Sequence, residues 1–177
     1  LNDLERVDLG RFKAVVFGNT WYMTARHRKF IRERVMTGAR HVLFQGLPAY
    51  CDGTKLDIGF SREATGLPLV RTTRTKPFAP QFVVEGESAP IAQRGTTWFA
   101  TEAVTDPATL RRVFQAAGAH IYVDSGDIIH AGGGLVLVHS KDGGARKLRF
   151  RSGKSLDLNL PPKSSWIFDA ATGERVR

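Results

Sequence analysis

The sequence has a single cysteine, Cys51, among its 177 residues, so no disulfide bond can form within the chain. Its apolar runs have the length of β-strands, and none approaches the roughly 20 residues that a membrane-spanning helix needs. The first residues also lack the basic start and the apolar middle of a signal peptide. These absences predict a soluble fold that is stabilised by packing alone and argue against insertion into a membrane. Because the chain begins with leucine, we expect it to be a fragment or a processed product.

Motifs for metal binding and for nucleophilic catalysis are absent as well. The histidines never occur in an H-x-x-x-H or H-E-x-x-H spacing, and one cysteine cannot supply a ligand pair. Cys51 lacks the G-x-C-x-G framing of a nucleophile elbow, and no His-x-Glu pair occurs late in the chain. We therefore predict no metal site, no cofactor and no catalytic residue.

Glycoside hydrolysis needs two carboxylates across the scissile bond, and nothing in the sequence marks such a pair. Asp124 and Asp127 are interpreted as turn and linker residues, because aspartate readily accepts hydrogen bonds from its own backbone in turns. The carboxylates considered are Glu85, Glu87, Glu102, Asp124 and Asp127.

The chain has few acidic residues relative to basic ones, with a net charge of +9 and a pI of about 10.2. Such a charge suggests nucleic acid or another polyanion as a partner. The basic residues are scattered, however, and Arg149 and Arg151 alternate with Leu148 and Phe150 as on the solvent face of an antiparallel strand. We expect polyanion binding to be weak and diffuse, with no specific nucleic-acid partner.

Residues 13–53 predict a strand, a helix and a second strand that pairs with the first in parallel. The strands are the apolar runs at residues 13–17 and 41–45, of the kind buried on both faces of a parallel sheet. Thr24 is a suitable N-cap for the helix between them, and Gly38 suits its left-handed end.

Further along the chain, a helix is predicted over residues 56–65 with Gly66 at its end, and another after the N-cap Asp106. Residues 68–95 contain several prolines and predict a long connection with one strand at 81–84. Strands are predicted at 96–100 and 120–123, and β-hairpins beyond them. We divide the chain into an α/β domain, residues 1–125, and a small β-domain, residues 126–177. The prolines are Pro68, Pro77, Pro80 and Pro90.

The runs KAVVFGNTWYMTARHRKFIRERV, HVLFQGLPAYCDG and DPATLRRVFQAAGAHIYVDSGDIIHAGGGLVLVHS resemble the glutamine-amidotransferase-like domain of multidomain glycoside hydrolases. The comparison is with the trimerisation domain that follows the catalytic barrel in beta-galactosidases. The terminal run SSWIFDAATGERV resembles the small β-domain that closes such chains. The resemblance implies a flavodoxin-like, class I glutamine-amidotransferase-like parallel sheet with helices on both faces, then a small antiparallel β-domain. It also implies a catalytic barrel and further copies of the chain as partners, in the bacterial cytoplasm or secreted.

The loops after the first two strands carry the candidate site residues. Consecutive parallel strands joined by one helix are commonly neighbours, so these loops should lie side by side at the carboxyl edge of the sheet. Aromatic rings and polar groups there suit contact with a glycan or with a partner domain. Alternatively, the aromatic residues cover the end of the sheet. The predicted contact residues are Asn19, Trp21, Tyr22, Tyr50 and Asp52.

Three functions follow from these observations. The first is a non-catalytic ancillary region of a carbohydrate-active glycoside hydrolase such as a beta-galactosidase, with a role in oligomerisation or at the substrate rim. The second is a stand-alone amidotransferase-like hydrolase that uses Cys51. The third is a polyanion-binding protein.

Overall fold

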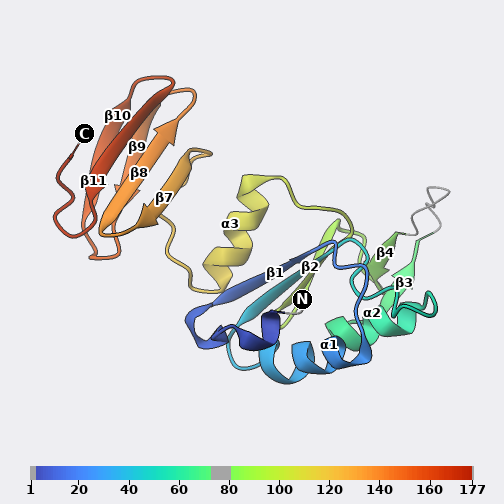
Figure 1. Cartoon of the computed structure of the whole chain (residues 1–177). Coiled ribbons are helices and arrows are strands. Elements are labelled where there is room, and N and C mark those ends of the chain that lie inside the picture. Colours follow the sequence, from blue (N-terminus) through green and yellow to red (C-terminus); the bar gives the residue numbers. More distant parts are fainter. Residues whose placement is uncertain (1–2, 73–80, 177) are drawn as a thin grey trace. The chain divides into compact units, whose positions relative to one another are not determined.

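The computed structural model describes residues 3–72 and 81–176 (Figure 1). The chain divides into two compact units, Leu1–Ala119 and His120–Arg177. The division lies a few residues before the boundary that the sequence predicts at residue 126.

The first unit contains a four-stranded sheet with the order β1-β2-β6-β5. β1 and β2 are parallel, with Val15 opposite Val42, so the parallel pairing predicted for residues 13–17 and 41–45 is confirmed. β6 is parallel to β2, but β5 is antiparallel to β6. The sheet is therefore mixed. Its strands are β1 (Ala14–Gly18), β2 (His41–Gln45), β5 (Ile91–Arg94) and β6 (Thr97–Ala100).

The predicted fold class, a flavodoxin-like parallel sheet with helices on both faces, is wrong. Strands dominate the described residues, and the other sheets are small and antiparallel. Residues 68–95 do not form a connection with one strand: β3 (Leu69–Arg71) pairs antiparallel with β4 (Phe82–Val84), and β5 follows. Gly95, with φ +59°, lies in the tight turn that folds β6 back against β5. Pro77 and Pro80 lie outside the described residues.

The helices of the first unit begin where the sequence places good caps. The Thr24 side chain accepts a hydrogen bond from His27 N, and the Asp106 carboxylate accepts from Ala108 N and Thr109 N. Gly66, with φ +68°, ends a helix as predicted. The helical segments are η1 (Leu4–Arg6), η2 (Leu9–Arg11), α1 (Ala25–Phe30), the π-helical turn η3 (Ile31–Val35), α2 (Ile58–Thr65) and α3 (Pro107–Ala116).

The core of the first unit is divided by its sheet, because successive residues of β2 point to opposite faces. Val42 and Phe44 belong to the cluster that contains residues of η3, and Leu43 belongs to a separate cluster with Val113 of α3. β1 differs from the prediction, because Val16 is 39% exposed. β1 is the edge strand of this sheet and is not buried on both faces.

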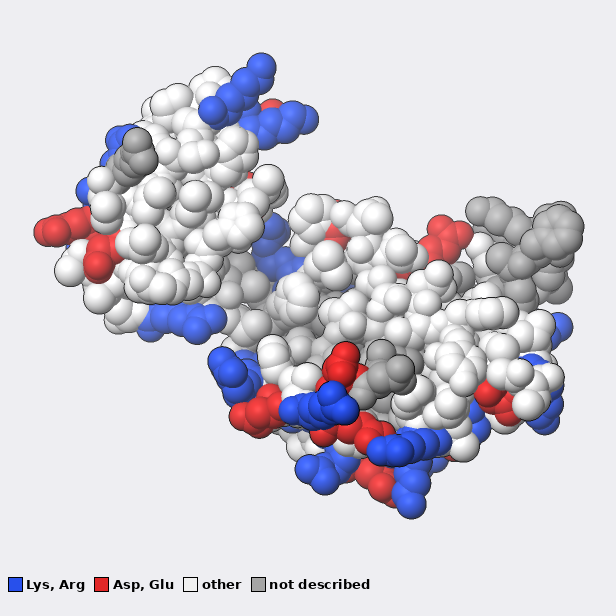
Figure 2. Space-filling model, in the orientation of Figure 1, with Lys and Arg blue, Asp and Glu red and all other residues white. Residues whose placement is uncertain are grey.

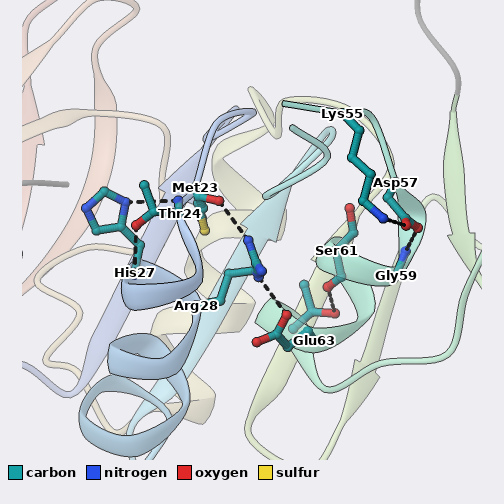
Figure 3. Close-up of polar contacts among 10 residues, drawn as sticks. Met23, Thr24, His27, Arg28, Lys55, Asp57, Gly59, Ser61 and Glu63 are labelled. Atoms are coloured by element: carbon teal, nitrogen blue, oxygen red, sulfur yellow. Dashed lines mark hydrogen bonds and ion pairs between the residues drawn. The ribbon is translucent and has the colours of Figure 1, made fainter. Parts of the chain in front are cut away.

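A buried arginine joins α1, α2 and the segment before α1 (Figure 3). The Arg28 guanidinium donates to Glu63 Oε2 at 2.7 Å and to Met23 O at 2.9 Å. It also lies over the Phe60 ring, 4.3 Å from the centroid. The Arg28 side chain is only 6% exposed, so its charge depends on these partners for the hydrogen bonds that water would otherwise provide.

In its described part, residues 120–176, the second unit has strands and no helix, and its strand pairings are antiparallel. Leu148 and Phe150 are buried as the alternation predicts. Residues 120–123, predicted as a strand, form none; Tyr122 O accepts one hydrogen bond, from Arg149 N. The strands are β7 (Ile128–Gly132), β8 (Leu135–Ser140), β9 (Gly144–Arg149), β10 (Ser155–Leu160) and β11 (Ser164–Asp169), in the sheets β11-β8-β7 and β10-β9.

The turn between β8 and β9 requires glycine at residue 143. Gly143 has φ +71°, and a Cβ there would lie 2.6 Å from Pro162 N and 2.7 Å from Leu160 O. Both atoms belong to the backbone, so no side-chain rotation can relieve the overlap. Gly133, in the hairpin between β7 and β8, has φ +58° but nothing within 4 Å of such a Cβ.

Replacing Glu63 by glutamine should lower the free energy of unfolding by about 1–3 kcal/mol, because a buried guanidinium loses its charged acceptor. The matched control is Glu33→Gln, since Glu33 and Lys29 are 61% and 73% exposed and lie 4.0 Å apart. The control should change stability by less than about 0.5 kcal/mol. Chemical denaturation measures both, and equal effects would contradict a special role for Arg28.

The glycine pair provides a second test. Gly133→Ala should cost about 1 kcal/mol, from left-handed backbone strain alone. Gly143→Ala should cost at least about 3 kcal/mol, because the methyl group also overlaps backbone atoms. Thermal and urea unfolding would show the difference, and equal losses would mean that the strand at Leu160 moves aside freely.

Candidate functional site

The loops after β1 and β2 lie side by side and are joined by backbone hydrogen bonds. Ala49 N donates to Thr20 O at 2.8 Å, Cys51 N donates to Trp21 O at 3.0 Å, and Met23 N donates to Cys51 O at 3.0 Å. The predicted neighbourhood of the two loops at the carboxyl edge of the sheet is confirmed. These hydrogen bonds form a short ladder that holds the two loop backbones together.

Three apolar side chains on this ladder are exposed. Trp21 and Tyr22 are 46% and 48% exposed, and Leu56 is 55% exposed. Tyr22 is bridged to Cys51, and Cys51 is bridged to Leu56. Residues directly opposite in such bridges point to the same face, so Tyr22 and Leu56 flank Cys51 on one surface. We call Trp21, Tyr22 and Leu56 the edge patch.

Leu56 is the member of this patch that the sequence reading misses, because residues 56–65 are predicted as one helix. The helix starts at Ile58, since the Asp57 carboxylate accepts a hydrogen bond from Gly59 N at 2.7 Å. Recognising Asp57 as an N-cap would have placed Leu56 outside the helix.

Tyr50, predicted as a contact residue, is buried, with only 4% of its surface exposed. Its ring meets the Phe82 ring edge-on at 5.1 Å, and Arg71 donates a hydrogen bond to its hydroxyl. Tyr50 therefore belongs to the core and offers no surface to a partner. The sequence gives no sign of this, because both contacts come from β3 and β4.

Asn19 is exposed and Asp52 is half-buried, and both have local structural roles. Asn19 adopts φ +48°, and its side-chain oxygen would lie 3.3 Å from a Cβ at Gly46. The Asp52 carboxylate accepts hydrogen bonds from Thr54 N, Thr54 Oγ1 and Lys55 N at 2.8, 2.7 and 3.0 Å. These bonds, first that from the Thr54 backbone, lower the pKa of Asp52 from 3.8 to about 2. Asp52 shapes the loop that carries Leu56.

Cys51 is not placed beside a histidine within the described residues. Its Sγ lies 3.4 Å from the Gly53 N–H, which donates to it. The histidines with side-chain hydrogen bonds have other partners: His27 with Thr24, His41 with Trp98, His120 with the Arg149 carbonyl and His139 with Ser165. This geometry shows no thiolate and imidazolium pair.

Asp124 and Asp127 both form ion pairs with arginines of β9. Asp124 Oδ2 accepts from Arg149 at 2.7 Å, and Asp127 pairs with Arg146. Burial works to raise the pKa of Asp127, but hydrogen bonds from Arg146 and Ser125 outweigh it and lower the pKa. The Asp127 carboxylate is buried and has a structural role in the second unit, whereas the exposed pair of Asp124 with Arg149 adds little stability.

Residues 3–72 and 81–176 contain no group of three His, Cys, Asp or Glu side chains arranged to hold a metal ion. None of the described helices is long and apolar enough to cross a membrane. On the face shown in Figure 2, basic side chains are interspersed with acidic ones and form no continuous stripe. Arg26, for example, donates to Glu5 at 2.8 Å. Weak, diffuse polyanion binding stays a prediction.

No protein-family model matches this chain, and a search of curated proteins finds no match either. The resemblance to glycoside hydrolases therefore stays a prediction from the sequence.

The pKa of Asp52 gives a test of the loop structure. Because its pKa is lower in the folded state, ionised Asp52 stabilises the loop above about pH 4, and this contribution is lost as the pH falls through about 2. NMR titration of its carboxyl carbon should show a midpoint near 2, and Thr54→Val should move the midpoint upward. A midpoint near 3.8 in the unaltered chain would contradict the hydrogen-bonded turn.

Proposed function

We propose that this chain is a non-catalytic contact region of a larger carbohydrate-active enzyme. In this proposal the edge patch docks onto the catalytic domain of the same enzyme, where it borders the substrate site. The single observation that carries the proposal is the exposure of Trp21 and Tyr22, at 46% and 48%. Both lie on loops whose backbones are hydrogen-bonded to each other.

Two physical arguments support a docking role for the edge patch. Large apolar side chains exposed on neighbouring loops can mark an interaction site, and tryptophan and tyrosine often contribute most to binding energy. The ladder between Trp21, Cys51 and Met23 also orders the loops before any partner arrives. Ordering them on binding would otherwise lower the affinity.

The carbohydrate-active enzyme in this proposal comes from the sequence resemblance described above. The two alternatives have less support. An amidotransferase-like hydrolase needs a base beside Cys51, and no histidine among the described residues contacts it. A polyanion-binding protein needs a continuous basic surface, which the face in Figure 2 lacks.

The test uses the protein translated from the complete reading frame, assayed with p-nitrophenyl glycosides. The double substitution Trp21→Ala/Tyr22→Ala should lower kcat/KM by about tenfold or more, through lost docking at the substrate rim. The variant should remain folded, as far-UV circular dichroism would show, because both side chains lie outside the core clusters of buried residues. The 177-residue chain alone should show no glycosidase or glutaminase activity.

The control is Phe12→Ala, since Phe12 is an aromatic residue of the same unit with a similar exposure of 47%. It should leave kcat/KM unchanged. The proposal is overturned if the double variant is fully active, if the reading frame encodes no glycoside hydrolase domain, or if Cys51→Ala abolishes turnover by the isolated chain.

A further inference from the structure

A concave site lies within the first unit at the carboxyl end of β6, and it shares no residue with the edge patch. It is a cavity of about 1020 Å³. Its walls come from residues 87–91, which lead into β5, from residues 100–106, which follow β6, and from Thr109 of α3. Cavities of this size accept small organic ligands up to a disaccharide.

The walls combine apolar and hydroxyl groups. Val83, Ile91 and Val104 are half-buried and supply apolar surface. Thr101 and Thr105 line the same space, and within the described residues their hydroxyls make no hydrogen bond to the protein. Both hydroxyls are therefore able to donate to a ligand and to accept from it.

Among the residues that the structure describes, the charged groups lining the cavity are all acidic, although the chain has a net charge of +9. No lysine, arginine or histidine lines it in the part of the chain that the structure describes. A phosphate or carboxylate ligand would face the carboxylates of Glu87, Glu102 and Asp106, which disfavours an anion.

Two of these three carboxylates already interact with other groups of the protein. The Asp106 carboxylate accepts hydrogen bonds from the first turn of α3, and Glu87 lies 3.5 Å from Arg94. Within residues 3–72 and 81–176, the hydrogen bond to the Glu102 carboxylate comes from the neutral Gln81 side chain, at 2.7 Å. A single carboxylate without a cationic partner would bind a polyamine, which carries several positive charges, only weakly. This carboxylate, the threonine hydroxyls and the apolar wall together suit a sugar ring. Such a ring has hydroxyl groups on its edge and C–H groups on its face.

We propose that this cavity binds a neutral polyhydroxylated ligand, a monosaccharide or disaccharide. The ligand's hydroxyls donate to Glu102 and exchange hydrogen bonds with Thr101 and Thr105, and its C–H face packs on Ile91 and Val104. The site is additional to the docking function proposed for the edge patch and does not depend on it.

The experiment is an NMR titration of the ¹⁵N-labelled 177-residue chain with D-galactose, D-glucose, D-mannose, lactose and cellobiose, and separately with spermidine and inorganic phosphate. At least one sugar should produce saturable shifts confined to residues 83–91 and 100–109. Thr101→Val and Glu102→Gln should each weaken that binding by about fivefold, because each removes one polar partner. The spectrum elsewhere should be unchanged, which shows that the variants are folded.

The matched control is Thr96→Val, since Thr96 lies at the opposite end of β6, is half-buried and does not line the cavity. It should bind the sugar as the unaltered chain does. Shifts with spermidine alone or with phosphate alone, no shifts with any sugar, or equal sugar binding by Thr101→Val would each overturn the proposal. Activity of the edge-patch variants does not enter this test, so the two proposals fail separately.

Discussion

The first unit depends on one strand that is paired on both edges and covered on both faces. β2 bonds to β1 on one side and to β6 on the other, and four of its five residues are buried. Phe44 stacks on Phe17 of β1 with ring centroids 5.0 Å apart, and Leu43 packs on the opposite face with Trp98 of β6. Because all three strands run the same way, the segments that follow them open at one edge. The edge patch and the cavity beyond β6 are both consequences of that constraint.

Local signals in the sequence predict the local structure well. Thr24, Asp106 and Gly66 mark helix ends through hydrogen bonds or backbone conformation that involve only a few neighbouring residues. The parallel pairing of β1 and β2 is also predictable, because one short helix between two apolar runs leaves little choice of topology. The adjacency of the two loops follows from that pairing.

The errors arise where segments distant in sequence decide the outcome. Tyr50 is buried because β3 and β4 bring Arg71 and Phe82 against it, and those strands lie in a segment that predicts a connection. The prediction of the fold class is wrong for a related reason. A strand, a helix and a parallel strand can occur in a mixed sheet as well as in a parallel one. The hairpin at Gly95 makes this sheet mixed. The cavity has no motif either, since its walls come from separate short segments that carry no catalytic or ligand-binding spacing.

Main-chain hydrogen bonds join the two loops that carry the edge patch. The bonds that align Trp21 with Cys51, and Cys51 with Met23, use N–H and carbonyl groups that every residue except proline possesses. The side chains of Trp21 and Tyr22 take no part in these hydrogen bonds and are exposed, so they can be replaced without breaking the ladder. The surface that these two side chains present can therefore change while the two loops stay joined to each other.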